Sequence, residues 1–69
     1  MDIKEIGKII REKRKKWGFT QAEAAGMCNV GVRFLSELEN GKATLQIGRV
    51  LHVIEAFGFD VNLTDRSEK

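Results

Sequence analysis

Residues 20–41 of the chain are TQAEAAGMCNVGVRFLSELENG, and they predict two short helices folded around a tight turn. Thr20 can cap the first helix, and the small pair Ala24–Ala25 in its middle allows another helix to cross closely. Asn29 stands where the chain must turn, because asparagine tolerates the left-handed conformation that most residues avoid. The second helix should end at Asn40–Gly41, a usual helix stop. Two helices joined by such a turn can place one of them in the major groove of DNA.

This segment, with Gly18–Phe19 before it and Lys42 after it, resembles the helix-turn-helix of phage-repressor and Cro-like (XRE) transcriptional regulators. The stretch FLSELENGK (residues 34–42), followed by a helix and then GFDVNL (residues 58–63), is similar to the HipB-like antitoxin branch. The resemblance covers residues 6–64. It implies a mostly α domain of four to five helices that binds double-stranded DNA.

The composition favours one small globular domain. The 69 residues are 42% hydrophobic and 32% charged, and a chain of this length is too short for a deep catalytic cleft around a large core. No apolar stretch has transmembrane length, and the first residues, MDIKE, lack the form of a signal peptide. The single cysteine, Cys28, cannot form an internal disulfide. We therefore expect a cytoplasmic protein.

The positive charge is clustered. Five of the six residues 11–16 are cations, although the formal net charge of the whole chain is only +2. A solvated helix face is the simplest interpretation of such a run. Arg14 differs, because at about 100° per residue it lies at the edge of an apolar stripe. A buried guanidinium needs a carboxylate, and Glu39 is the expected partner because it lies beside the inward Leu35 and Leu38. The resemblance also implies an arginine and a glutamate at these positions. We assign Arg14 and Glu39 to a structural ion pair.

Two further helices and one strand complete the prediction. The first helix should span about Asp2–Trp17, with Asp2 as its cap and Gly18 as its stop, and its apolar stripe consists of Ile3, Ile6, Ile10 and Trp17. The last helix should span about Gln46–Phe57, with apolar spacing at Ile47, Val50, Leu51, Ile54 and Phe57. Residues 59–64 alternate apolar and polar side chains, as a half-buried strand does. The predicted domain is therefore residues 1–64, and residues 65–69 form a polar tail.

A lone strand cannot satisfy its own backbone groups. The simplest solution is antiparallel pairing with the same strand of a second copy, which would bury Phe59, Val61 and Leu63 over both cores. The resemblance to the antitoxin branch also implies a dimer formed through such a strand. The alternative is a loosely packed C-terminal extension, which the clean alternation does not favour.

The helical phase of residues 32–40 assigns the side chains that face DNA. Leu35 and Leu38 point inward with Phe34 beside them, so the candidates for base contact lie opposite: Val32, Arg33, Ser36 and Glu37. An arginine can bind guanine, a serine several base edges, a glutamate the cytosine amino group and a valine the thymine methyl. Glu37 has an equal alternative, an exposed acid that forms a salt bridge or repels wrong sequences.

The candidates for phosphate contact lie beside that helix: Thr20, Gln21, Asn40 and Lys42. Helix N-terminal amides can face a phosphate, and the resemblance implies that a glutamine at the position of Gln21 binds the DNA backbone. The family usually has serine or threonine at the position of Gly31. Glycine is an acceptable cap, but it removes a hydroxyl that could hold a phosphate.

No other constellation points to chemistry. Cys28 and His52 lie on separate elements without further ligands, so we expect no metal and no cofactor. We find no nucleophile triad, acid–base pair or phosphate loop in the sequence. We therefore expect that the protein is not an enzyme.

The sequence therefore predicts a homodimeric, sequence-specific DNA-binding repressor, the HipB-like antitoxin of a toxin–antitoxin operon. By the resemblance, the toxin would be a HipA-like kinase, and the complex would repress its own operon. The alternatives are a free-standing Cro-like regulator and a protein-interaction adaptor that has kept only the fold.

Overall fold

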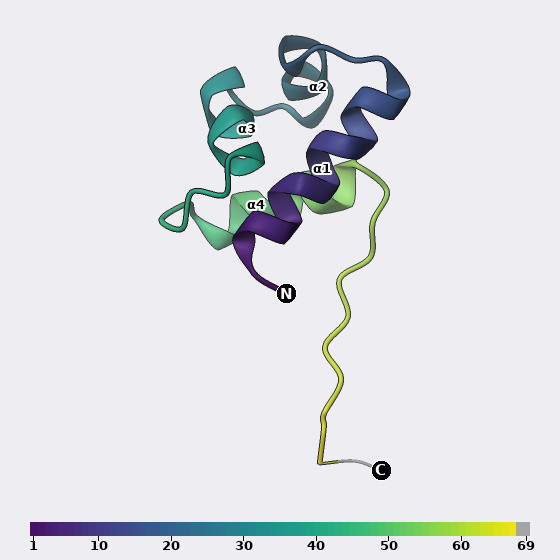
Figure 1. Cartoon of the computed structure of the whole chain (residues 1–69), viewed down its shortest axis with the longest axis vertical. Coiled ribbons are helices and arrows are strands. Elements are labelled where there is room, and N and C mark those ends of the chain that lie inside the picture. Colours follow the sequence, from purple (N-terminus) through teal and green to yellow (C-terminus); the bar gives the residue numbers. More distant parts are fainter. Residues whose placement is uncertain (68–69) are drawn as a thin grey trace.

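The computed structural model describes residues 1–67, and four helices joined by short turns make up its body (Figure 1). They are α1 (Ile3–Trp17), α2 (Gln21–Cys28), α3 (Val32–Glu39) and α4 (Ile47–Ala56). The α2–turn–α3 unit packs on α1, and α4 passes behind α1 in this view. The predicted polar tail ends outside the described residues, at 68–69.

Local capping sets the ends of the first two helices. The Asp2 carboxylate accepts a hydrogen bond of 2.9 Å from the Glu5 amide and so begins α1. Thr20 and Glu23 form a reciprocal capping box at the start of α2. Asn29 ends α2 in the left-handed conformation with φ 58°, which an asparagine adopts at low cost. The turn expected between the two helices is therefore present.

The core lies where α1, α2, α3 and α4 meet. Its fully or nearly buried apolar residues are Ile10, Ala24, Ala25, Cys28, Phe34, Leu35, Leu38, Val50, Val53 and Phe57. The apolar residues whose spacing predicts α4 do not all face the core, because Ile47 and Leu51 are exposed, and Val53 is buried in addition. The inward face of α4 is centred on Val50, Val53 and Phe57, which places Ile47 and Leu51 on the flank of the helix.

Gly7 allows α1 and the end of α3 to approach backbone to backbone. A β-carbon at Gly7 would lie 2.1 Å from the Leu38 carbonyl oxygen and 3.0 Å from that of Glu39. Both neighbours are backbone atoms, so rotation of a side chain cannot relieve the overlap. Only glycine fits this crossing.

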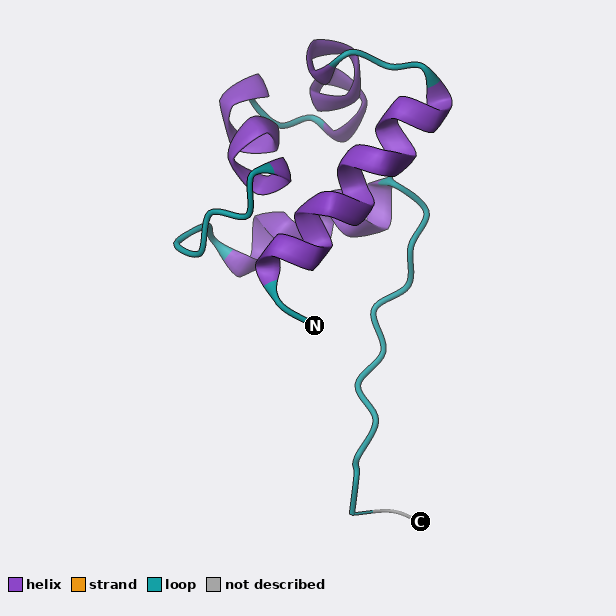
Figure 2. Ribbon diagram, viewed as in Figure 1, coloured by secondary structure: helices purple, strands orange, loops and turns teal. Residues whose placement is uncertain are grey.

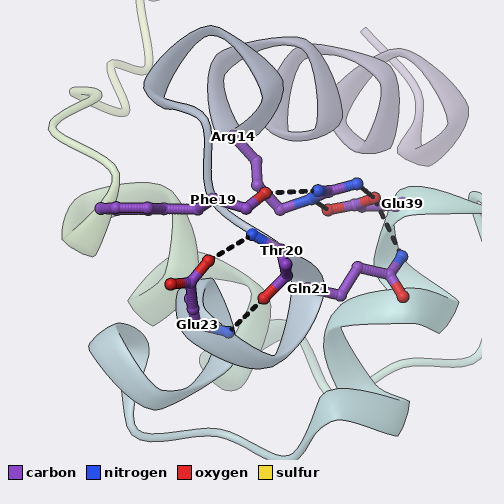
Figure 3. Close-up of polar contacts among 6 residues, drawn as sticks. All are labelled: Arg14, Phe19, Thr20, Gln21, Glu23 and Glu39. Carbon is purple, nitrogen blue, oxygen red and sulfur yellow. Dashed lines mark hydrogen bonds and ion pairs between the residues drawn. The ribbon is translucent and has the colours of Figure 1, made fainter.

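A buried ion pair joins α1 to α3, as Figure 3 shows. Arg14 Nε donates to Glu39 Oε2 at 2.7 Å and Arg14 Nη2 to Oε1 at 3.0 Å, and the two side chains are 10% and 2% exposed. Arg14 Nη1 also donates to the Phe19 carbonyl at 2.7 Å, and Gln21 Nε2 donates to Glu39 Oε1 at 3.1 Å. The hydrogen bond to Glu39 raises the pKa of Arg14 above its ordinary value against the opposing effect of burial. The pair predicted from helical phase therefore connects three helices.

The C-terminal segment is not a strand in the single chain. Within residues 1–67 the structure contains no β-strand, and the segment after α4 extends away from the helices (Figure 2). The predicted strand at 59–64 is therefore absent here, because a ladder needs a partner strand and the single chain offers none. Phe59 packs against the core, whereas Leu63 is 98% exposed.

Lys13 fixes the start of this segment. Its ammonium group donates a hydrogen bond to the Phe57 carbonyl, the cap of α4, and lies 4.3 Å from the centre of the Phe59 ring. The same group lies 5.0 Å from the centre of the Trp17 ring. Both distances are within the range of a favourable cation–π interaction. Lys13 thus holds the segment where it leaves the helices.

The crossing at Gly7 makes a paired prediction. Gly7→Ala should lower the free energy of unfolding by about 1–3 kcal/mol, because the added methyl overlaps fixed backbone. Gly48→Ala, on α4, should instead raise it by about 0.5–1 kcal/mol, because open space surrounds that position and alanine favours a helix. Chemical denaturation of both variants measures the difference. A Gly7 variant as stable as wild type would contradict the close crossing.

The Arg14–Glu39 pair makes a second prediction. Arg14→Ala and Glu39→Ala should each lower the free energy of unfolding by about 3 kcal/mol, because each leaves a buried charge without its partner. The double variant should cost less than the sum of the two. Thermal and denaturant melts of the three variants give this cycle, and additive losses would show that the two side chains do not act as a pair.

Candidate nucleic-acid interface

One side of α3 remains accessible to solvent, although it is only half-exposed at Ser36 and Glu37. Phe34, Leu35 and Leu38 are buried on the inner side, while the Arg33 side chain is 90% exposed on the outer side. Val32 is exposed at the start of the helix, and Ser36 and Glu37 are half-buried. The four side chains considered for base contact therefore all keep access to solvent on one helix. Val32 and Arg33 protrude furthest.

Glu37 joins two of the candidate cations. Its Oε2 lies 3.0 Å from Lys42 Nζ and 3.6 Å from Arg33 Nε. The hydrogen bond from Lys42 is the main cause that lowers the pKa of Glu37 below its ordinary value, so the carboxylate is charged at neutral pH. The turn after α3 brings Lys42 back, because the Lys42 amide donates to the Glu37 carbonyl at 3.0 Å and Gly41 adopts φ 75°.

Thr20 and Gln21, the two candidates for phosphate contact at the start of α2, also stabilise the fold. Thr20 Oγ1 accepts the capping hydrogen bond from the Glu23 amide, and its hydroxyl hydrogen can still donate outward. Gln21 is half-buried and donates one amide hydrogen to Glu39, which leaves its second amide hydrogen for an outside acceptor. The ion pair therefore positions the side chain expected to contact a phosphate.

Asn40 and Gly31 bound α3. Asn40 is exposed and closes the helix with a hydrogen bond of 3.0 Å from its amide to the Ser36 carbonyl. Gly31 precedes the helix in an extended conformation, and no side chain caps α3 there. A side chain added at Gly31 would meet open space. The N-terminal end of α3 is thus accessible to a large anionic partner.

Arg49, at the start of α4, extends the positive surface beside α3. Its guanidinium carbon lies 4.5 Å from the centre of the Phe34 ring, and the residue is exposed. Helical periodicity cannot find this contact, because it links two helices through a loop. The stacking holds a cation next to α3.

The remaining candidates for chemistry have structural surroundings. His52 Nε2 lies 2.7 Å from the Cys28 carbonyl oxygen, so this imidazole connects α4 to the end of α2. Burial raises the pKa of the Cys28 thiol, which favours an inert, protonated side chain. Among residues 1–67 no three histidine, cysteine or acidic side chains gather as a metal site would require. No helix in this part of the chain combines the length and apolar character needed to cross a membrane.

Comparison with known proteins agrees with this geometry. Residues 10–63 match the helix-turn-helix family. The chain is 40% identical over 65 residues to an uncharacterized HTH-type transcriptional regulator, y4mF, of Sinorhizobium fredii, which covers 94% of this chain and 86% of that protein. It is 31% identical over 55 residues to the HTH-type transcriptional regulator RamB of Mycobacterium tuberculosis, covering 80% of this chain but 12% of that protein. The chain therefore belongs to the helix-turn-helix family, with an XRE-type DNA-binding domain.

Proposed function

We propose that the protein is a sequence-specific transcriptional repressor that inserts α3 into the major groove of its operator. The observation that carries this proposal is the two-sided character of α3, whose apolar side is buried while its polar side is open. Arg33 would bind guanine, and Ser36 and Val32 would contact neighbouring base edges. The proposed function needs no chemical step and no cofactor.

Phosphate contacts would position α3 in the groove. Gln21 and Thr20 lie at the start of α2, and Asn40 and Lys42 lie at the end of α3, so phosphate contacts from two separate elements would fix the depth and register of α3. The Arg14–Glu39 pair supports this arrangement because Glu39 also holds Gln21. Phosphate contacts carry no sequence information themselves.

We propose that the repressor is a homodimer. Leu63 and Val61 are exposed on the C-terminal segment, and this segment forms one wall of an apolar groove completed by α1 and α4. Ile9, Ile47 and Leu51 line that groove and are exposed as well. A second copy would cover these side chains and give residues 59–64 an antiparallel partner. The two recognition helices would then bind a palindrome with half-sites roughly 34 Å apart.

We further propose that this repressor is the antitoxin of a toxin–antitoxin pair and represses its own operon together with a HipA-like kinase. The similarity of residues 34–42 and 58–63 to the HipB-like branch supports this role. A second candidate is a free-standing regulator, which the description of the Sinorhizobium fredii relative as a transcriptional regulator favours. A neighbouring gene for a kinase-like toxin, and co-purification of the two products, would separate the two roles.

The proposed division between base and phosphate contacts makes a third prediction. Arg33→Ala should weaken binding to the preferred duplex by about 1–3 kcal/mol and relax specificity at one symmetric position, because one base contact is lost. Lys42→Ala should weaken scrambled as well as selected duplexes and flatten the dependence on salt, because it removes a phosphate contact. Fluorescence anisotropy on selected and scrambled duplexes at several salt concentrations measures both effects.

Lys16→Ala is the matched control, since it removes a cation from the far end of α1. It should leave the sequence specificity unchanged, and it should alter the salt slope less than Lys42→Ala does. An Arg33 variant that loses selected and scrambled binding equally would contradict base contact by Arg33. Wild-type protein without salt-dependent binding to any duplex would favour the adaptor alternative.

The proposed dimer makes a fourth prediction. A chain truncated after Asp60 keeps Phe59, which packs on the core, but loses Val61 and Leu63, so it should sediment as a folded monomer. A chain truncated after Thr64 lacks only the polar tail and should remain a dimer. Analytical ultracentrifugation compares the two. A stable dimer of the shorter chain would place the interface on the exposed flank of α4 instead.

A further inference from the structure

The side chains proposed to bind DNA are bound to one another in the free chain. Glu37 lies between Arg33 and Lys42, with its Oε2 within 3.0 Å of the lysine and 3.6 Å of the arginine nitrogen. The Glu37 side chain is only 28% exposed, whereas those of Arg33 and Lys42 are 90% and 48% exposed. A single carboxylate therefore pairs with Arg33, near the start of α3, and with Lys42, just beyond the end of the helix.

This contact is local and does not depend on long-range packing. Arg33 precedes Glu37 by one helical turn, and the turn at Gly41 returns Lys42 to the same place. The backbone hydrogen bond from the Lys42 amide to the Glu37 carbonyl keeps the two residues together even if the side chains separate. The carboxylate thus stays close to both cations when DNA approaches.

A DNA phosphate and the Glu37 carboxylate compete for the same hydrogen-bond donors. When Lys42 binds a phosphate, the phosphate and the Glu37 carboxylate repel each other across the shared ammonium, which weakens the contact between Lys42 and Glu37 and leaves the carboxylate facing the negative backbone of DNA. Guanine and thymine offer only hydrogen-bond acceptors in the major groove, which a carboxylate cannot bind, and adenine places an acceptor beside its amino donor. The cytosine amino group is a donor, and it can replace the lysine as the partner of Glu37.

We propose that Glu37 determines specificity by exchange: it occupies Arg33 and Lys42 on wrong sequences and releases them where a cytosine amino group donates to its carboxylate. The inference rests on the proposed function and adds a role to it. Glu37 weakens binding to every duplex, but at the right site a hydrogen bond to a base replaces the lost ion pairs. Discrimination then arises from the penalty on wrong sequences as much as from the hydrogen bond at the right one.

Glu37→Gln tests the exchange, with Glu12→Gln as its matched control. Each change raises the formal net charge by one, but Glu12 lies on α1 and takes part in none of the ion pairs found among residues 1–67. Anisotropy on selected and scrambled duplexes over a salt series measures affinity and slope. Glu37→Gln should tighten scrambled binding by about three- to tenfold, the size expected for freeing exposed ion pairs. The ratio of selected to scrambled affinity should fall, and the scrambled salt slope should steepen by about one.

Two further measurements keep the test independent of general charge. In a Lys42→Gln background, Glu37→Gln should have a smaller effect on scrambled binding, because one of the occupied cations is already gone. In the free protein, Lys42→Gln should raise the pKa of Glu37 in a carboxyl NMR titration, which needs no DNA.

The outcomes separate this inference from the proposed function. Equal effects of Glu37→Gln and Glu12→Gln on scrambled duplexes would overturn the exchange and leave a general charge effect. Equal weakening of selected and scrambled duplexes by Glu37→Gln would also overturn it, because Glu37 would then support binding to any sequence. Wild-type protein that binds no duplex would overturn the proposed function itself.

Discussion

The buried contact between Arg14 and Glu39 is the constraint on which the rest of the structure depends. Glu39 is the last residue of α3, and its carboxylate also receives the side chain of Gln21, the first residue of α2. One carboxylate therefore fixes the end of the proposed recognition helix relative to the start of the helix proposed to hold phosphate. Apolar residues of similar volume could fill this space at no loss of stability, but they would not set this orientation. The ion pair thus connects the core to the geometry of the interface.

The elements predictable from sequence are those whose causes are local. Asp2, Thr20 and Asn29 mark helix ends because each acts on backbone groups within a few residues. Helical phase also places Arg14 and Glu39 toward the core, since the apolar neighbours of each define an inner side. The close crossing at Gly7 is not predictable in this way, because its reason is the backbone of α3, which lies about thirty residues further along the chain. For Glu37 the sequence offers a salt bridge as one interpretation, and the structure adds its partners: Arg33, one helical turn earlier, and Lys42, which the turn at Gly41 brings back to α3.

The C-terminal segment shows a different limit of sequence reasoning. Its alternating pattern predicts that Phe59, Val61 and Leu63 share one buried face, yet only Phe59 packs against the core, and the single chain forms no strand within residues 1–67. The pattern describes which side chains need cover, not where the cover comes from. Lys13 and the core hold Phe59, whereas nothing in the described chain covers Leu63. A segment anchored at one end and open at the other can order on a partner without disturbing the helices.

The distribution of charge bears on how so small a domain could avoid binding all DNA. Its net charge is only +2, and two cations of the proposed interface are tied to an acid on the same helix. Free cations would attract the phosphates of every sequence, since this attraction is independent of sequence and strong at low salt. An internal carboxylate reduces that general attraction where the bases are contacted and leaves other cations unaffected. A DNA-binding regulator must find one site among very many competing ones, so lowering general affinity improves selection as effectively as raising specific affinity.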